Sequence, residues 1–214
     1  MAEYTTDEER FSALVNFFKD NKNTFLAIFS ITSISLIFFL SYQSYSSSQN
    51  EKAAVIYDAW FSSLASSASD TTNSVDHFNQ LQEKYSGTGY AQLARIIRGS
   101  SLAKEEQFDA ALDDFNALLK TSSGFFGNEM INSIAKINIA RIELSKNNFS
   151  NALQILESFN SGTEHPLVYE VKGDALVGLD KNTLALDQYS LALQNTKNES
   201  EQSILKIKIN KLKN

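Results

Sequence analysis

Residues 24–42, TFLAIFSITSISLIFFLSY, are an uncharged and apolar run near the start of a chain of 214 residues. No charged side chain occurs between Lys22 and Glu51. Because about 20 helical residues cross the ~30 Å hydrocarbon core of a bilayer, the run predicts a transmembrane helix. Hydroxyl groups within it can donate to carbonyl oxygens one turn earlier. We expect a permanent anchor; the alternatives are a signal peptide cleaved near residues 46–48 and a buried core helix.

Basic residues close to the run predict its orientation. Arg10, Lys19 and Lys22 precede it, whereas only Lys52 lies within the next ~20 residues, and basic residues favour the cytoplasmic side. We therefore expect the N-terminus in the cytoplasm and the remainder of the chain outside it.

The segment before the run, residues 7–21, has apolar side chains at helical spacing and acidic residues at its start, where the helix dipole favours them. The apolar residues are Phe11, Leu14, Val15, Phe17 and Phe18. This pattern predicts an amphipathic helix on the membrane surface or on a partner protein. The alternative is a polar helix that simply extends the span.

Composition excludes several protein classes. The chain has no cysteine, which rules out disulfide scaffolds and thiolate metal sites. A net charge of −6 argues against nucleic-acid binding, which needs a basic surface. One proline and eight glycines offer little turn chemistry for an all-β fold. The sequence therefore favours an all-α protein.

The chain after the run reads as helices joined by short turns. A Ser-rich stretch at 41–51 suggests a short stalk, either helical or flexible. Residues 53–64 and 75–85 have apolar side chains at a period of 3.6, with 66–74 as the predicted loop between them.

A repeat is visible in the second half of the chain. Gly99, Ala140 and Gly173 are each followed 12 residues later by an alanine and 4 residues after that by a large apolar residue. The full set of repeat-packing residues is Gly99, Phe108, Ala111, Phe115, Ala140, Phe149, Ala152, Leu156, Gly173, Ala185 and Tyr189. Turns are predicted at 104–107, 146–148 and 179–182. Small residues let two antiparallel helices approach closely, so the pattern predicts hairpins stacked into an α-solenoid.

The spacing is typical of tetratricopeptide repeats, which have a length of about 34 residues. Ala152 and Ala185 are 33 residues apart, whereas Ala111 and Ala152 are 41 apart. The additional residues fall in 121–129, between helix pairs. We therefore expect tetratricopeptide-like helix hairpins of degenerate sequence.

The last segment, residues 200–214, mixes isoleucine and leucine with lysines. A solenoid needs a terminal helix with one polar face, which is the interpretation we favour. The alternative is a basic patch that binds anionic lipid or an acidic partner.

No pattern of catalytic residues is present. His77 and His165 lie far apart in the sequence, and no nucleotide-binding or nucleophile motif occurs. The adjacent carboxylates Asp113 and Asp114 point in different directions on a helix, so both are expected to be solvated. We predict no enzyme activity, no metal and no cofactor.

Function is then expected in the surface made by the first helix of each hairpin. Arginine and tyrosine often anchor protein interfaces. The candidate groove residues are Arg95, Arg98, Asn138, Arg141, Tyr169 and Lys172.

The layout resembles the ancillary SecYEG translocon subunit family of Gram-negative bacteria. The stretches that carry the resemblance are SALVNFFKDNKNTFLAIF (12–29), GYAQLARI (89–96), INIARIELSKNNFSNAL (137–153), VKGDAL (171–176) and IKINKL (207–212).

The resemblance implies a single-pass bacterial inner-membrane protein with a cytoplasmic lead (1–23), a transmembrane helix (24–42) and a periplasmic repeat domain (43–214). It implies association with the SecYEG translocon and with a membrane-anchored periplasmic prolyl isomerase chaperone, and a role in passing secreted clients to periplasmic chaperones. A second hypothesis is an envelope or cell-division scaffold that forms a homo-oligomer through its repeats.

Overall fold

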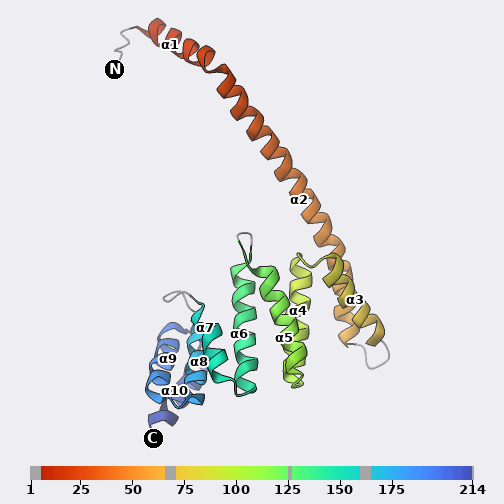
Figure 1. Cartoon of the computed structure of the whole chain (residues 1–214), viewed down its shortest axis with the longest axis vertical. Helices are drawn as coiled ribbons and strands as arrows, with labels where there is room; N and C mark the ends of the chain where they lie inside the picture. Colours follow the sequence, from red (N-terminus) through yellow and green to blue (C-terminus); the bar gives the residue numbers. More distant parts are fainter. Residues whose placement is uncertain (1–5, 66–70, 125–126, 160–164, 214) are drawn as a thin grey trace. The chain divides into compact units, whose positions relative to one another are not determined.

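The computed structural model describes residues 6–65, 71–124, 127–159 and 165–213. These ranges contain α-helices and no strand, which confirms the predicted all-α class. The helices, shown in Figure 1, are α1 (Asp7–Asp20), α2 (Lys22–Ala65), α3 (Thr71–Lys84), α4 (Gly89–Lys104), α5 (Phe108–Ser122), α6 (Glu129–Ser145), α7 (Phe149–Glu157), α8 (Pro166–Gly178), α9 (Asn182–Asn195) and α10 (Glu199–Lys213).

The chain divides into two compact units, Met1–Lys52 and Ala53–Asn214. In the first unit, α1 begins with a capping box. The Thr6 hydroxyl accepts a hydrogen bond from the Glu9 N–H (3.3 Å), and the Glu9 carboxylate accepts one from the Thr6 N–H (3.4 Å). Two of the otherwise unpaired N–H groups at the helix start are thereby satisfied. Asn21 then separates α1 from α2.

Helix α2 has 44 residues and is therefore about 66 Å long. It is the one helix within the described ranges that is long and apolar enough to cross a membrane. None of its apolar window is buried, so the alternative of a buried core helix is wrong. Thr32 satisfies its hydroxyl within the helix by donating to the carbonyl oxygens of Ile28 and Phe29, both at 2.9 Å. The Ser-rich stretch at 41–51 is helical throughout.

In the second unit, α4 and α5, α6 and α7, and α8 and α9 form successive hairpins, and α10 packs on α9. Figure 1 shows α4, α5 and α6 side by side, followed by α7 to α10. The first helices of neighbouring hairpins also touch, α4 with α6 and α6 with α8. This is the predicted α-solenoid. Helix α3 begins at Thr71, so residues 71–74 are helical and not part of a loop as predicted; residues 66–70 lie outside the described ranges.

The three hairpin turns share one backbone conformation. Glu106, Asn147 and Asp180 have φ values of 60°, 59° and 58°. In each turn the next residue donates its N–H to the carbonyl five residues earlier, as in Gln107 to Leu102 at 2.9 Å. This is the Schellman arrangement, which ends a helix on a left-handed residue. The predicted turns are therefore confirmed, and the left-handed residues recur at the same intervals of 41 and 33 residues as the alanines.

Four apolar clusters follow one another along the second unit. Trp60 from the end of α2 packs with Phe78 and Leu81 of α3 and with α4. The next clusters join α5 to α6, α6 and α7 to α8, and α8 and α9 to α10. Each cluster spans two adjacent layers, so each hairpin depends on its neighbours to bury its second face.

Candidate functional site

Two glycines on first helices face aromatic rings on second helices. A methyl group at Gly99 of α4 would lie 3.0 Å from Cε2 of Phe115 on α5. A methyl group at Gly173 of α8 would overlap the ring of Tyr189 on α9. The absence of a Cβ is therefore what lets the two helices of these two hairpins approach so closely.

The middle hairpin has an alanine and a leucine at the positions that a glycine and an aromatic residue occupy in the other two. Ala140, Ala152 and Leu156 are fully buried in one cluster. Ala111 and Ala185 are also fully buried, in the clusters on either side. A leucine in place of an aromatic ring leaves room for the alanine methyl group.

Phe108 and Phe149 begin the second helices of the first two hairpins and are half-buried. The Phe149 ring packs so closely on Gly178 of α8 that a methyl group there would overlap it. This contact links two successive hairpins. Gly178 was not among the predicted packing residues, because a glycine just before a turn is expected to end a helix.

Arg95 and Arg98, one turn apart on α4, both bind Asp114 of α5. Arg98 makes a two-point contact, with Nε 2.7 Å from Oδ2 and Nη2 3.0 Å from Oδ1. Nη1 of Arg95 lies 3.0 Å from the same Oδ1. The Arg98 guanidinium also lies 3.7 Å from the ring centroid of Phe78 on α3. The two arginines of α4 therefore connect this helix to both α5 and α3.

The side chain of Asp114 is only 1% exposed, so the prediction that it is solvated is wrong, whereas Asp113 is exposed as expected. Burial lowers the pKa of Arg95 from its ordinary value; the positive charge of Arg98 acts in the same direction, and Asp114 opposes it. The two partly exposed arginines are the compensating charges that make burial of the Asp114 carboxylate tolerable.

The other predicted groove residues are distributed along α6 and α8. Asn138 donates from Nδ2 to the Ile134 carbonyl (2.8 Å) within its own helix, and Arg141 is exposed. Tyr169 and Lys172 are half-buried, with Tyr169 packed on the cluster that joins α8, α9 and α10. The groove that these residues were expected to line stays a prediction.

A second charged network holds the terminal helix. Lys208 of α10 lies 2.7 Å from Oε1 of Glu170 and 2.7 Å from Oδ1 of Asp174, both on α8. The Tyr189 hydroxyl of α9 donates to the same Asp174 oxygen (2.7 Å). Lys208 therefore attaches α10 to α8, as expected of a helix that ends the stack.

The pKa values of this network are raised. Burial raises the pKa of Tyr189, and donation to Asp174 raises it further. Burial alone would lower the pKa of Lys208, but hydrogen bonds to Asp174 and Glu170 outweigh it and leave the pKa above its ordinary value. Both groups therefore hold their protons more tightly in the folded chain.

Two hollows flank the start of α6 and share Glu129, Asn132 and Lys136. The hollow beside α5 has a volume of about 560 Å³, and the one beside α8 about 260 Å³. Nδ2 of Asn132 donates to Oγ of Ser123 (3.0 Å), and the Lys136 ammonium lies 5.2 Å from the ring centroid of Phe159. Amide and hydroxyl groups of this kind can pair with a peptide backbone.

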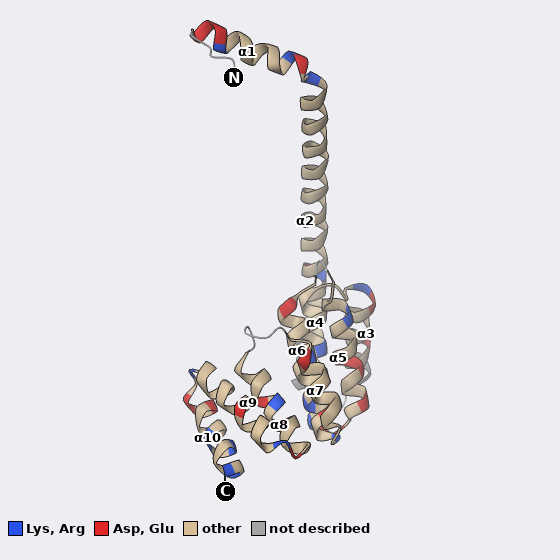
Figure 2. Cartoon of the chain, turned by 60° about the vertical axis from the view of Figure 1, so that its left-hand side comes forward, with Lys and Arg blue, Asp and Glu red and all other residues tan. Residues whose placement is uncertain are grey.

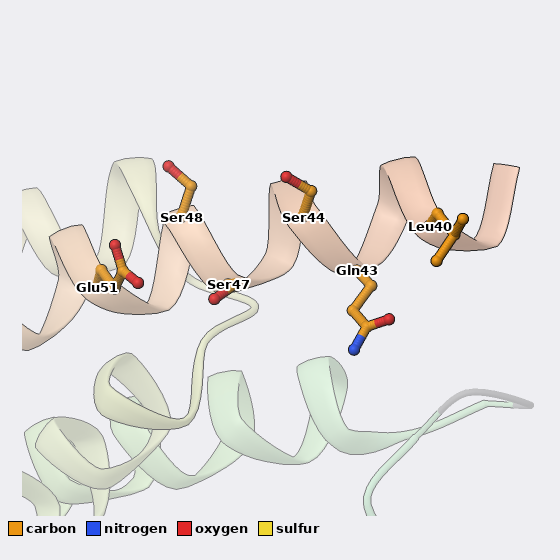
Figure 3. Close-up of a pocket in the computed structure, with 6 residues that line it drawn as sticks. All are labelled: Leu40, Gln43, Ser44, Ser47, Ser48 and Glu51. Carbon is orange, nitrogen blue, oxygen red and sulfur yellow. The ribbon is translucent and has the colours of Figure 1, made fainter. Parts of the chain in front are cut away.

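A further hollow of about 460 Å³ lies along α2, lined by Leu40, Gln43, Ser44, Ser47, Ser48 and Glu51. Figure 3 shows that these side chains do not converge, since Ser44 and Ser48 point to one side of the helix and Gln43 and Ser47 to the other. It is a shallow helix surface and offers no enclosed site for a small molecule.

Among the described residues, no three histidine or acidic side chains are grouped as a metal site would require. Nδ1 of His165 instead accepts a hydrogen bond from the Leu167 N–H (3.3 Å) at the start of α8. The described residues form packed helix hairpins with exposed surfaces and do not form a metal site.

Comparison with known proteins identifies relatives that match the whole chain and relatives that match part of it. A Haemophilus influenzae protein named Ancillary SecYEG translocon subunit is 22% identical over 212 residues, which cover 99% of this chain and 100% of that protein. A Neisseria gonorrhoeae protein of the same name is 21% identical over the full length of both. A Buchnera aphidicola protein, also of that name, is 25% identical over 124 residues, 58% of this chain and 62% of that protein. No solved structure matches.

The family model described as tetratricopeptide repeat-like domain matches residues 16–214. That range contains the apolar run and every hairpin described above. The predicted resemblance to ancillary SecYEG translocon subunits is thus confirmed, and the chain belongs to the tetratricopeptide repeat-like domain family.

Proposed function

We propose that this chain is an accessory subunit of the Sec translocon that binds other proteins through its helical-repeat domain. It is a single-pass protein of the bacterial inner membrane, with residues 1–23 in the cytoplasm, 24–42 in the bilayer and 43–214 in the periplasm. Its partners are the SecYEG translocon and a membrane-anchored periplasmic prolyl isomerase chaperone, and it passes secreted clients to such chaperones.

The observation that carries this proposal is the combination of one apolar helix with a stack of hairpins. The apolar helix supplies an anchor, and the contacts of α4 with α6 and of α6 with α8 align the first helices along one face. Continuous faces of this kind bind proteins in solenoids. The names of the two full-length relatives indicate the translocon as the partner.

We infer binding and not catalysis because the charged groups that the stack brings together are held in ion pairs with one another. Asp114 is shared by two arginines, and Lys208 is shared by two carboxylates. Groups paired in this way stabilise helix contacts and are not poised to transfer a proton. The proposed activity needs no metal and no cofactor.

In-cell photocrosslinking tests the proposal. A photoreactive residue at the exposed Arg141 of α6 should crosslink to a SecYEG subunit or to the prolyl isomerase chaperone. The same residue at the exposed Asp187 of α9, on a second helix, is the matched control. Crosslinks to neither partner at Arg141, or equal crosslinking at both positions, contradict the proposal.

The alternative is a self-associating envelope or cell-division scaffold, and one feature of α10 favours it. Ile204 and Ile207 are 50% and 68% exposed on the helix that ends the stack, where a polar face is usual. Light scattering of the full chain in detergent distinguishes the two functions. A dimer that the substitution Ile207→Glu converts to a monomer supports the scaffold, and a monomer in both cases contradicts it.

A further inference from the structure

Helix α1 carries an exposed apolar stripe. Phe11, Leu14 and Phe18 are spaced so that they lie on one side of the helix, and they are 71%, 56% and 50% exposed. Glu9 and Asn16 lie on the opposite side, and no residue of α1 is buried. A stripe of three large apolar side chains is costly to leave in water.

The junction of α1 with α2 is built as a corner. Asn21 interrupts the helix, and its Nδ2 donates to the Phe17 carbonyl at the end of α1 (2.9 Å). The ring of Phe25 on α2 lies 4.6 Å from that of Phe18 and 5.8 Å from that of Phe17, measured between centroids. All these residues belong to the unit Met1–Lys52. Figure 2 shows α1 turned away from the axis of α2.

The corner lies where the apolar run begins. Figure 2 shows α2 without charged residues over most of its length, with basic and acidic residues on either side of the corner. These are Lys19, Asp20 and Lys22. Charged groups are expensive in the hydrocarbon core, so this corner must lie at the bilayer surface if α2 spans the membrane. A helix that starts there and turns away from the span runs along the surface.

We propose that α1 is an interfacial helix, with its Phe11, Leu14 and Phe18 stripe inserted between lipid headgroups and acyl chains. The inference rests on the proposed membrane span of α2. It argues against the interpretation of residues 7–21 as a helix that extends the span, since a break stabilised by Asn21 and three phenylalanine rings does not continue the span. Helices with one apolar and one charged face bind membranes in this way.

The occupant of the stripe is the acyl region of the lipid, and anionic headgroups contribute little. Helix α1 carries four acidic residues, Asp7, Glu8, Glu9 and Asp20, against the two basic residues Arg10 and Lys19. Negative charge of this kind is repelled by anionic lipid. Insertion should therefore be at least as deep in phosphatidylcholine alone as in a mixture with phosphatidylglycerol.

Because the chain has no cysteine, single-cysteine spin labelling can test the inference directly. Leu14→Cys reports on the apolar stripe, Asn16→Cys is the matched control on the polar side, and Ile34→Cys reports on the span. Each full-length variant is placed in nanodiscs, which expose both membrane surfaces and contain no other membrane-spanning protein. Collision rates are measured with oxygen, which concentrates in lipid, and with a water-soluble nickel chelate.

The oxygen-to-nickel ratio should be several-fold higher at Leu14 than at Asn16, highest at Ile34, and not raised by phosphatidylglycerol. Equal ratios at Leu14 and Asn16, with Ile34 still shielded from nickel, overturn the interfacial helix but leave the span intact. Nickel access at Ile34 overturns the span and the inference with it. A Leu14 label shielded from both reagents points to contact with a second copy of the chain, and also overturns the inference.

Discussion

At the scale of single residues, Asp114 is the side chain expected to contribute most to the contact between α4 and α5. It is almost fully buried and forms ion pairs with two arginines of another helix. Asp114→Asn keeps the shape but leaves both guanidinium groups without a counter-charge. Because these groups are partly exposed, we expect the free energy of unfolding to fall by about 2–4 kcal/mol, towards the lower end for a broken buried ion pair.

Urea denaturation followed by the fluorescence of Trp60 measures this loss. Trp60 is the only tryptophan, and its ring lies 5.9 Å from that of Phe78, on which Arg98 stacks. Asp113→Asn is the control and should change the free energy of unfolding by less than about 0.5 kcal/mol. Equal effects of the two substitutions would show that Asp114 has no special role.

Gly173 offers a second test at this scale. Gly173→Ala gains helix propensity of ~1 kcal/mol, but its methyl group overlaps the Tyr189 ring, and such overpacking costs about 1–3 kcal/mol. We expect net destabilisation, seen as a lower urea midpoint. Gly89→Ala is the matched control, because a methyl group at that position would have no neighbouring atom within 4 Å. A midpoint for Gly173→Ala at or above that of the control would disprove the close contact.

The sequence indicates which small residues lie between the helices of a hairpin. It does not indicate which charged residues form ion pairs. Gly99, Gly173 and the alanines could be recognised because close helix approach demands small residues at fixed spacing. The pairing of Arg98 with Asp114 could not, since it depends on which faces of α4 and α5 meet in space. Two neighbouring aspartates look equally polar in sequence, and only packing distinguishes the buried one.

At the scale of elements, the hairpin turns carry strain that can be relieved. Glu106 adopts φ = 60°, which costs a residue with a Cβ roughly 1 kcal/mol and glycine nothing. Glu106→Gly should therefore raise the urea midpoint, with a gain in free energy of ~0.5–1 kcal/mol. Glu105→Gly, one residue earlier with φ = −84°, should lower it. The same sign for both substitutions would contradict the assignment of the left-handed position.

The attachment of α10 should weaken at high pH. Tyr189 has a pKa above its ordinary value of 10.0, so the unfolded chain loses this proton first as the pH rises. The resulting stability is complete below pH 10.0 and decreases above it, and Lys208 acts in the same direction. The thermal midpoint, followed by circular dichroism, should fall less steeply above pH 10.0 in Tyr189→Phe than in the natural chain. Parallel profiles would contradict this role.

Element boundaries were predictable where a local signal exists. The three turns have polar residues between apolar helices, and the structure has them where the sequence indicates. The start of α3 was missed because threonine and serine at 71–74 are typical of loops, whereas tertiary packing of Phe78 and Leu81 favours extending the helix. The Ser-rich stretch at 41–51 was ambiguous for the same reason.

At the scale of the whole molecule, the two units should be separable. The buried clusters of the stack draw only on residues of Ala53–Asn214. The end of α2 supplies Ala53 and Trp60 to the first of these clusters. A chain beginning at Ala53 should therefore have the same thermal midpoint of unfolding as the stack has in the full-length protein.

A chain beginning at Thr71 removes Trp60 and exposes Phe78 and Leu81. Loss of a buried tryptophan costs ~3–5 kcal/mol, which corresponds to a midpoint roughly 10 °C lower for a domain of this size. Circular dichroism melts of both chains measure the difference, and Trp60→Ala in the longer chain should reproduce most of it. If both truncations melt together, the end of α2 belongs to the anchor alone, and the stack begins at α3.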